Sequence, residues 1–254
     1  MNLSETLGNF LGLVVILAFI GLVIIFAVAG RSRPGRNLRE LLAFTRLRRA
    51  AGLAVEEGTR LHVSVGRGEI FDLAGGAALE GFTILERTTR AASISDRPPI
   101  ATSGTGTVAA LSRNTMDEAY QAVGAGSQYN PVSGRLTGPT PFSFAAGVLP
   151  IIHDEDVSIN ILAGHFGSEV ALIADASERS GSLMVAGSDD VPAQAVLYAM
   201  AQEPLIGEEL YAGGAYLSAG PLHAASLHAE DVLRWILILV IPILAIAKLF
   251  GFLP

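Results

Sequence analysis

The sequence predicts an α/β domain with a mostly parallel sheet, flanked by two transmembrane helices. Two long apolar runs lie near the ends of the chain, and between them short β-favouring runs alternate with helical patterns. Half of the 254 residues are hydrophobic, only 16% are charged, and the mean hydropathy is +0.47. This composition excludes a disordered chain and indicates membrane segments. Cysteine is absent, which excludes disulfides, thiol chemistry and cysteine-ligated metals.

The first membrane helix is expected at residues 10–30, after a short extracytoplasmic tip at residues 1–9. Residues Phe10–Ala29 contain no charged side chain, and a helix of this length spans about 30 Å, the thickness of a bilayer's hydrocarbon core. A cleaved signal peptide is the alternative, because Ala27, Val28 and Ala29 have a small-x-small pattern. The residues before the run carry Glu5 and neither Lys nor Arg, whereas a signal peptide begins with positive charge. We therefore favour a retained helix.

The second membrane helix, with a short C-terminal tail, is expected at residues 232–254. Its apolar run, Trp235–Leu253, contains Pro242, which predicts a kink, and Lys248, which lies close enough to the end to snorkel. Trp235 suits the membrane–water interface, where aromatic side chains are enriched.

The distribution of arginine predicts the topology. Seven arginines follow the first apolar run: Arg31, Arg33, Arg36, Arg39, Arg46, Arg48 and Arg49. The positive-inside rule assigns this side of the membrane to the cytoplasm, and Arg234 before the second run agrees. We expect a two-pass protein of the cell membrane, with the N- and C-termini outside and the main domain cytoplasmic.

A basic amphipathic helix is expected in the juxtamembrane segment, residues 31–57. Asn37 is its expected N-cap, and its apolar side chains follow helical spacing: Leu38, Leu41, Leu42, Phe44, Leu47 and Ala51. One interpretation is a helix on anionic lipid headgroups, with the seven arginines and Trp235 as membrane-surface residues. The other is a helix docked on its own domain, with the arginines acting only as the topology signal. We slightly favour the docked helix.

The charge of the cytoplasmic part argues against nucleic acid as a partner. Residues 31–50 hold seven Arg and one Glu, a net charge of +6, whereas residues 51–231 hold eight Arg and 22 Asp or Glu, a net charge of −14. The basic stretch is therefore local, and a phosphate backbone would meet an acidic domain.

The domain expected at residues 58–231 alternates strand and helix. Four β-favouring runs end in glycine, and a helical pattern follows each of them. This alternation predicts a Rossmann-like arrangement with four or more βα units. The expected strands are 61–66, 100–104, 157–164 and 183–187, and the expected helices are 76–92, 108–123, 168–178 and 191–201. Residues 124–150 are rich in Gly, Pro and Ser; either they form an ordered loop or residues 142–149 add a strand or short helix.

Several stretches of the chain resemble a family of uncharacterised bacterial membrane proteins of the Chloroflexota type, which contain a domain of unknown function. The resemblance covers most of residues 31–240. It rests on GLAVEEGTRLHVSVGRG, SDRPPIATSG, GRLTGPTPFSFAAGVLP, INILAGHFGSEVALIADASERS and MVAGSDDVPAQAVLYAMAQEPLIGEELYAGGAYL. It implies a membrane protein with a cytoplasmic-type globular domain. It implies no activity and no catalytic residues.

Ligands of open α/β sheets bind outside the carboxyl ends of the strands, so the strand-end loops are the candidate binding site. A Gly-rich turn that enters a helix can hold an anion through its backbone N–H groups. The alternative is a plain turn, in which glycine supplies positive φ and Ser or Thr caps the helix. We favour the plain turn, because the loops match no nucleotide-binding motif. The candidate ligand-binding residues are Arg67, Ser103, Gly104, Thr105, Thr107, His165, Ser168, Ser188 and Asp189.

No complete catalytic or metal-binding set is visible. The chain lacks a G-x-S-x-G motif, and the acidic turn at residues 153–156 lacks EF-hand spacing. His223 and His228 are off the i, i+4 spacing of a helical metal pair. We assign no catalytic residue, no metal and no cofactor.

Three functions remain open. We favour a noncatalytic membrane-anchored scaffold or accessory subunit, whose α/β domain mediates homo-oligomerisation or contacts within a larger membrane complex. The second is a membrane-tethered sensor or binding module for a small anionic ligand at the strand-end loops. A membrane-tethered enzyme is the third. In each case the lipid bilayer is the first partner.

Overall fold

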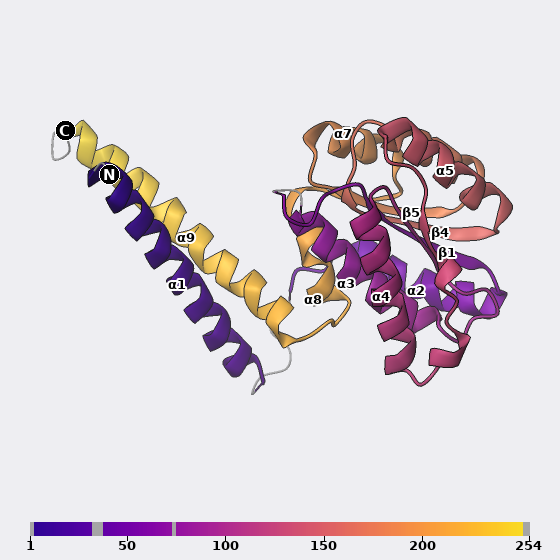
Figure 1. The fold of residues 1–254 in the computed structure, drawn as a ribbon. Coiled ribbons are helices and arrows are strands. Elements are labelled where there is room, and N and C mark those ends of the chain that lie inside the picture. Colours follow the sequence, from indigo (N-terminus) through magenta and orange to yellow (C-terminus); the bar gives the residue numbers. More distant parts are fainter. Residues whose placement is uncertain (1–2, 32–37, 73–74, 251–254) are drawn as a thin grey trace. The chain divides into compact units, whose positions relative to one another are not determined.

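The computed structural model describes residues 3–31, 38–72 and 75–250. The chain forms two compact units, one from residues 1–38 and 218–254, the other from residues 39–217 (Figure 1). Arg33, Arg36 and the expected N-cap Asn37 lie outside the described residues.

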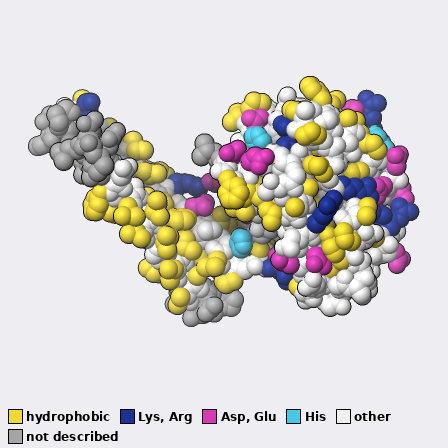
Figure 2. Space-filling view, viewed as in Figure 1, with side chains coloured by type: hydrophobic (Ala, Val, Ile, Leu, Met, Phe, Trp, Pro, Cys, Tyr) yellow, Lys and Arg dark blue, Asp and Glu magenta, His cyan; other side chains and the backbone are white. Residues whose placement is uncertain are grey.

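The first unit is a helical hairpin of α1 (Leu3–Arg31) and α9 (Pro221–Leu249), which lie side by side and antiparallel (Figure 1). Both helices are long and apolar enough to cross a membrane. Among the described residues of this unit, hydrophobic side chains make up most of the surface visible in Figure 2. The rings of Phe26 and His228 lie 5.8 Å apart, and Ala225 and Ala229 of α9 are buried. Helix α9 continues through Pro242 and begins at Pro221, well before its apolar run.

The second unit is built on a sheet of six parallel strands in the order β3-β2-β1-β4-β5-β6. This confirms the predicted α/β fold with a parallel sheet. The strands are β1 (Arg60–Gly66), β2 (Ile100–Ser103), β3 (Gly134–Leu136), β4 (Val157–His165), β5 (Leu183–Ser188) and β6 (Glu203–Leu205).

Helices cover both faces of the sheet (Figure 1). Leu61, Val63 and Val65 of β1 belong to the larger core with α2 (Leu42–Glu57), α3 (Gly75–Ala92) and α4 (Gly106–Ala122). Leu162 of β4 and Met184 of β5 belong to a second core with α5 (Pro141–Asp154), α6 (Val170–Arg179) and α7 (Val191–Met200). Because neighbouring strand residues face opposite layers, a strand buried on both faces reads as a continuous apolar run.

Helix α2 packs its apolar face on the sheet of its own unit. The buried residues of this helix are Ala43, Phe44, Leu47, Ala51 and Ala54. From Phe44 onward they are spaced by three or four residues, so they lie on one face. The basic side chains of this segment also meet acidic partners in the same unit. Arg46 pairs with Glu203 of β6, and Arg39 pairs with Glu209 at 2.7 Å. Arg48 and Arg49 are exposed.

The segment 124–150 contains three short elements and most of one helix. The short elements are η1 (Gly126–Gln128), η2 (Pro131–Ser133) and the edge strand β3. Residues 142–149, for which the sequence allowed either a strand or a short helix, belong to α5. A capping box begins this helix: Thr140 Oγ1 accepts from the Ser143 N–H, and Ser143 Oγ accepts from the Thr140 N–H. The sequence pattern did not reveal strands β3 and β6, because three residues are too few to show a period.

A buried carboxyl group joins α3 to the segment formed by η3 (Gly207–Ala212) and α8 (Gly213–Tyr216). Glu80 of α3 is 8% exposed and accepts a hydrogen bond from the Gly214 N–H. Burial raises the pKa of Glu80 to about 7, and this hydrogen bond opposes the shift only in part. The folded domain therefore binds a proton at Glu80 more tightly than the unfolded chain does.

Glu80 is expected to lower the stability of the domain as the pH rises. The folded state favours the protonated form of Glu80. The resulting contribution to the free energy of unfolding is complete below about pH 4.5, and it decreases as the pH rises to about 7. The loss is on the order of 3 kcal/mol. In Glu80→Gln, the amide oxygen still accepts from Gly214 but does not ionise. The melting temperature of Glu80→Gln relative to wild type should therefore increase between pH 5 and pH 8, measured by circular dichroism on the full chain in detergent. A constant difference across this range would contradict the assignment.

Candidate functional site

The direction of the strand order reverses between β1 and β4. From β1 the chain proceeds through β2 to β3 on one side, and from β4 it proceeds through β5 to β6 on the other. The loops that follow β1 and β4 therefore diverge, and a crevice at such a point is where ligands of open α/β sheets bind. The register brings Gly66 beside both Ser103 and His165, and Gly164 beside Ser188. The candidate residues of all four loops thus lie along one edge of the sheet.

Arg67 is held at this edge by an acidic residue of the neighbouring loop. Its Nε–H donates to Glu169 Oε1 at 2.9 Å, and the side chains are only 18% and 3% exposed. Burial would raise the pKa of Glu169, but the Gly167 N–H and Arg67 bind the carboxylate and hold its pKa below its usual value. Glu169 is therefore ionised and fixes the orientation of the guanidinium group. The sequence pattern gave no sign of Glu169, because the pairing joins residues about a hundred positions apart.

Two glycines permit the close packing around Arg67. A Cβ atom on Gly104 would lie 2.2 Å from Cγ of Arg67, so the β2–α4 turn and this side chain touch. Gly66 has φ of +78°, and a Cβ atom there would lie 2.4 Å from the carbonyl oxygen of His165. The N–H of Arg67 also donates to that carbonyl at 2.9 Å. Glycine at residue 66 thus lets the ends of β1 and β4 meet.

His165 and Asp189 form the second polar pair of the site. Nδ1 of His165 lies 2.7 Å from Oδ1 of Asp189, which joins the loops after β4 and β5. The side chains are 34% and 18% exposed, so solvent reaches the imidazole. When Nδ1–H donates to the carboxylate, Nε2 is the nitrogen open to a further contact.

Two of the candidate hydroxyl groups serve the fold. Ser188 Oγ is buried, accepts from the N–H groups of Phe166 and Asp190, and donates to the Phe166 carbonyl. Ser103 Oγ lies 3.1 Å from Ser112 Oγ of α4, and both are buried. Both hydroxyl groups therefore form hydrogen bonds within the α/β unit.

The other candidates lie at helix starts. Thr105 precedes α4, and its hydroxyl is buried without a hydrogen-bond partner in the described part of the chain. Thr107 lies exposed in the first turn of α4, and Ser168 is exposed before α6. Asp190 caps α7, where its side chain accepts a hydrogen bond from the Ala193 N–H.

A buried polar ladder behind the site was missed by sequence reasoning. His62 Nδ1 lies 2.6 Å from Asn160 Oδ1, and Nε2 lies 2.8 Å from Thr102 Oγ1. Complete burial lowers the pKa of His62 to about 4, against the effect of the Asn160 bond. The imidazole is thus neutral, with Nδ1–H donating to Asn160 and Nε2 accepting from Thr102. The sequence did contain a signal for this ladder, namely polar residues within three buried strands. Buried polar side chains cost free energy unless they form hydrogen bonds, so these side chains would be expected to bond one another.

The close approach at Gly66 makes a specific prediction for stability. Gly66→Ala places Cβ against a backbone oxygen at positive φ, whereas Gly124→Ala has nearly the same φ, +76°, with nothing within 4 Å. The strained φ alone costs about 1–2 kcal/mol. Gly66→Ala should therefore lower the melting temperature of the full chain in detergent by several degrees more than Gly124→Ala does. Equal losses for the two variants would show that β1 and β4 do not meet at this point.

Comparison with known proteins identifies the family of the chain. No curated protein and no solved structure matches it. A family model described as "Domain of unknown function (DUF6754)" matches residues 5–253, which include both apolar helices and the whole α/β unit. This agrees with the resemblance to a family of unknown function. The chain therefore belongs to the family with the domain of unknown function DUF6754.

Proposed function

We propose that this protein is a membrane-anchored, noncatalytic binding module, whose α/β unit holds a small anionic ligand at the carboxyl ends of β1, β2 and β4. The observation that carries the proposal is the reversal of strand order between β1 and β4, with Arg67 at the point of reversal. Such reversals are the usual ligand sites of α/β sheets, and Arg67 brings to this one guanidinium N–H donors beyond the one that Glu169 accepts.

The chemistry of Arg67 supports an anion. Its guanidinium group has five N–H donors in a planar fork, and Glu169 takes the one on Nε. The two Nη groups would then meet a carboxylate or phosphate in a bidentate manner. The turn Gly104–Thr105 touches the stem of the same side chain and leads into α4, whose N-terminus adds partial positive charge. His165 Nε2 supplies a further polar contact at the neighbouring strand.

A scaffold or accessory subunit is the second candidate, and the surface of α7 favours it. Val191 and Tyr198 are each 74% exposed, two turns apart on the same helical face. Such an exposed apolar strip suits contact with another protein of a larger membrane complex. A scaffold function requires no small ligand, so the two candidates differ in what they predict for the strand-end loops.

The location proposed for the α/β unit is the cytoplasm, and the protein is proposed to cross the cell membrane twice. Two helices of sufficient length and apolarity support a two-pass anchor. The seven arginines after the first apolar run support a cytoplasmic domain with both termini outside.

A ligand at this site should stabilise the protein against heat. A panel of nucleotides, sugar phosphates and dicarboxylates is added to the full chain in detergent, and unfolding is followed by circular dichroism. A ligand at about 100 times its Kd adds about 2.7 kcal/mol, or roughly 5–10 °C in melting temperature. Arg67→Ala should abolish the shift, and Arg67→Lys should reduce it because the fork is lost. Arg179→Ala, which removes an arginine 72% exposed on α6, is the control that should retain it.

The ligand proposal is wrong if no member of the panel raises the melting temperature. It is also wrong if Arg67→Ala keeps the full shift, because the ligand then binds elsewhere. In the first case, isolation of the protein with defined partners from its own membrane would favour the scaffold function.

The topology can be tested in a chain without cysteine. A membrane-impermeant maleimide should label Ser4→Cys in intact cells, and should label Ser180→Cys only after the membrane is opened. Ser180 is exposed at the C-terminal end of α6, so lack of access in intact cells would come from the membrane. Labelling with the opposite pattern would reverse the topology.

A further inference from the structure

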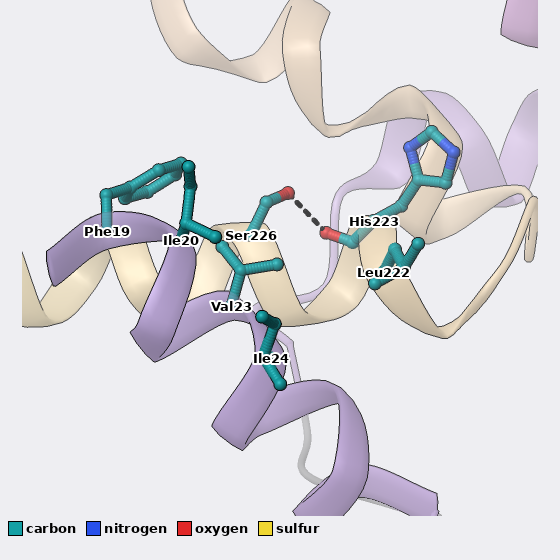
Figure 3. A pocket seen from close by; sticks show the side chains of 7 residues that line it. All are labelled: Phe19, Ile20, Val23, Ile24, Leu222, His223 and Ser226. Carbon is teal, nitrogen blue, oxygen red and sulfur yellow. Dashed lines mark hydrogen bonds between the residues drawn. The ribbon is translucent and has the colours of Figure 1, made fainter. Parts of the chain in front are cut away.

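The helical hairpin carries a groove between its two helices. One part of it, of about 370 Å³, lies between Phe19, Ile20 and Ile24 of α1 and Leu222 and His223 of α9 (Figure 3). A second part, of about 470 Å³, lies between the end of α1 and the start of α9. Ile24, Leu222 and His223 line both parts, so the two adjoin. We call them together the hairpin groove.

The hairpin groove extends along one half of the apolar run of α1. Its first and last lining residues on this helix are Phe19 and Val28. They are about 14 Å apart along the helix axis, close to half of the roughly 30 Å of a hydrocarbon core. If α1 crosses the membrane as proposed above, the groove therefore has the length of the acyl region of one leaflet.

The two helices are staggered, so the walls of the groove differ in character. The rings of Phe26 and His228 lie 5.8 Å apart. Arg234 follows His228 by about 9 Å of helix, and the same distance back from Phe26 leads to Ile20, near the middle of the apolar run of α1. The apolar run of α9 begins only at Trp235. Beside the groove, apolar surface thus comes mainly from α1, and α9 contributes polar side chains.

The wall formed by α9 has a polar edge without acidic groups. Ser226 Oγ donates to the His223 carbonyl at 2.9 Å, so this hydroxyl is used within the helix. The imidazole of His223 makes no hydrogen bond to another described residue. The residues that line the two parts of the groove include neither Asp nor Glu. The groove therefore combines an apolar wall with a polar side chain, and no carboxylate within it repels an anion.

Positive charge is concentrated at one end of the hairpin groove. Arg31 is the last residue of α1, about one turn beyond Val28, and the sequence continues with Arg33 and Arg36. The start of α9 at Pro221, which has no side-chain cap, adds partial positive charge at the same end. Basic residues that follow a membrane helix attract anionic lipid headgroups.

We propose that the hairpin groove binds an acyl chain of an anionic phospholipid, with the phosphate group at the end marked by Arg31. Charge complementarity selects this occupant. An apolar groove as long as one leaflet and positively charged at its end matches an acyl chain that carries a phosphate, whereas a helix of a partner protein requires no such charge. The lipid differs from the headgroups considered for residues 31–57, because it lies between α1 and α9. The proposal rests on the two-pass anchor and not on the strand-end ligand.

Tryptophan fluorescence tests the groove, because bromine on a lipid chain quenches only tryptophans that it approaches closely. The chain has one tryptophan, which Trp235→Phe removes. In that background, Ile24→Trp reports from the groove, and Ile25→Trp reports from about 100° around the helix at nearly the same depth. The two isoleucines are similarly exposed, 56% and 61%. The full chain is reconstituted in phosphatidylcholine vesicles with increasing fractions of brominated phosphatidylglycerol or, separately, brominated phosphatidylcholine.

The groove should distinguish the two lipids, and the control position should not. For Ile24→Trp, half-maximal quenching should require several-fold less brominated phosphatidylglycerol than brominated phosphatidylcholine. For Ile25→Trp, the two lipids should quench equally. Phe19→Trp, which exchanges one aromatic ring for another, is a second reporter in the groove and should show the same preference as Ile24→Trp. Arg31→Gln should reduce this preference several-fold, whereas Arg179→Gln, which removes an exposed arginine of α6, should retain it.

The possible contrary results have different meanings. Equal quenching by both lipids at Ile24→Trp and Phe19→Trp would overturn the anionic lipid as the occupant. Weak quenching at both groove positions with strong quenching at Ile25→Trp would show that protein covers the groove, and would also overturn the proposal. An unchanged preference in Arg31→Gln would overturn the position of the phosphate. Absence of quenching at all three positions would overturn the membrane anchor itself.

Discussion

The pairing of β1 with β4 is the contact on which the α/β unit depends. These two strands are neighbours in the sheet although some ninety residues separate them in the chain. The pairing joins the half of the sheet built before α5 to the half built after it, so both cores are anchored on it. It also creates the reversal of strand order, and it places Arg67 and His165 at the same end of the sheet. The stability of the unit and the proposed ligand site therefore depend on the same pairing.

The polar groups along β1 and β4 show how the same pairing is made specific. His62 contacts Asn160 across the pair and Thr102 on the other side, in surroundings where an unbonded polar group costs about 1–3 kcal/mol. A shift of register by one residue would turn these side chains into the opposite core and separate them. At the end of the same strands, the partly exposed Arg67 pairs with the buried carboxylate of Glu169. Replacing Arg67 alone would leave the buried carboxylate without its cation, which is costly.

Much of the fold could be predicted from the sequence because its central strands and helices are long enough to carry a period. The four runs that end in glycine are β1, β2, β4 and β5, and the helices after them begin and end within a few residues of the prediction. The edge strands have three residues each, and Pro204 lies within β6, so no sequence pattern predicts these two strands. The position of Arg67 at a strand end was readable from local sequence. Its partner Glu169, and the ladder from His62 to Asn160, depend on which strands become neighbours, and strand order is a property of the whole chain.

The hairpin illustrates the same limit for membrane segments. Hydropathy examines each helix separately and finds an apolar run in each, but it contains no information on how far one helix is displaced along the other. That displacement follows from side-chain packing, here from Phe26 against His228 and from the grooves between α1 and the first turns of α9. Only with this register known does Arg234 change from a residue that flanks a span to one that lies level with the middle of its neighbour.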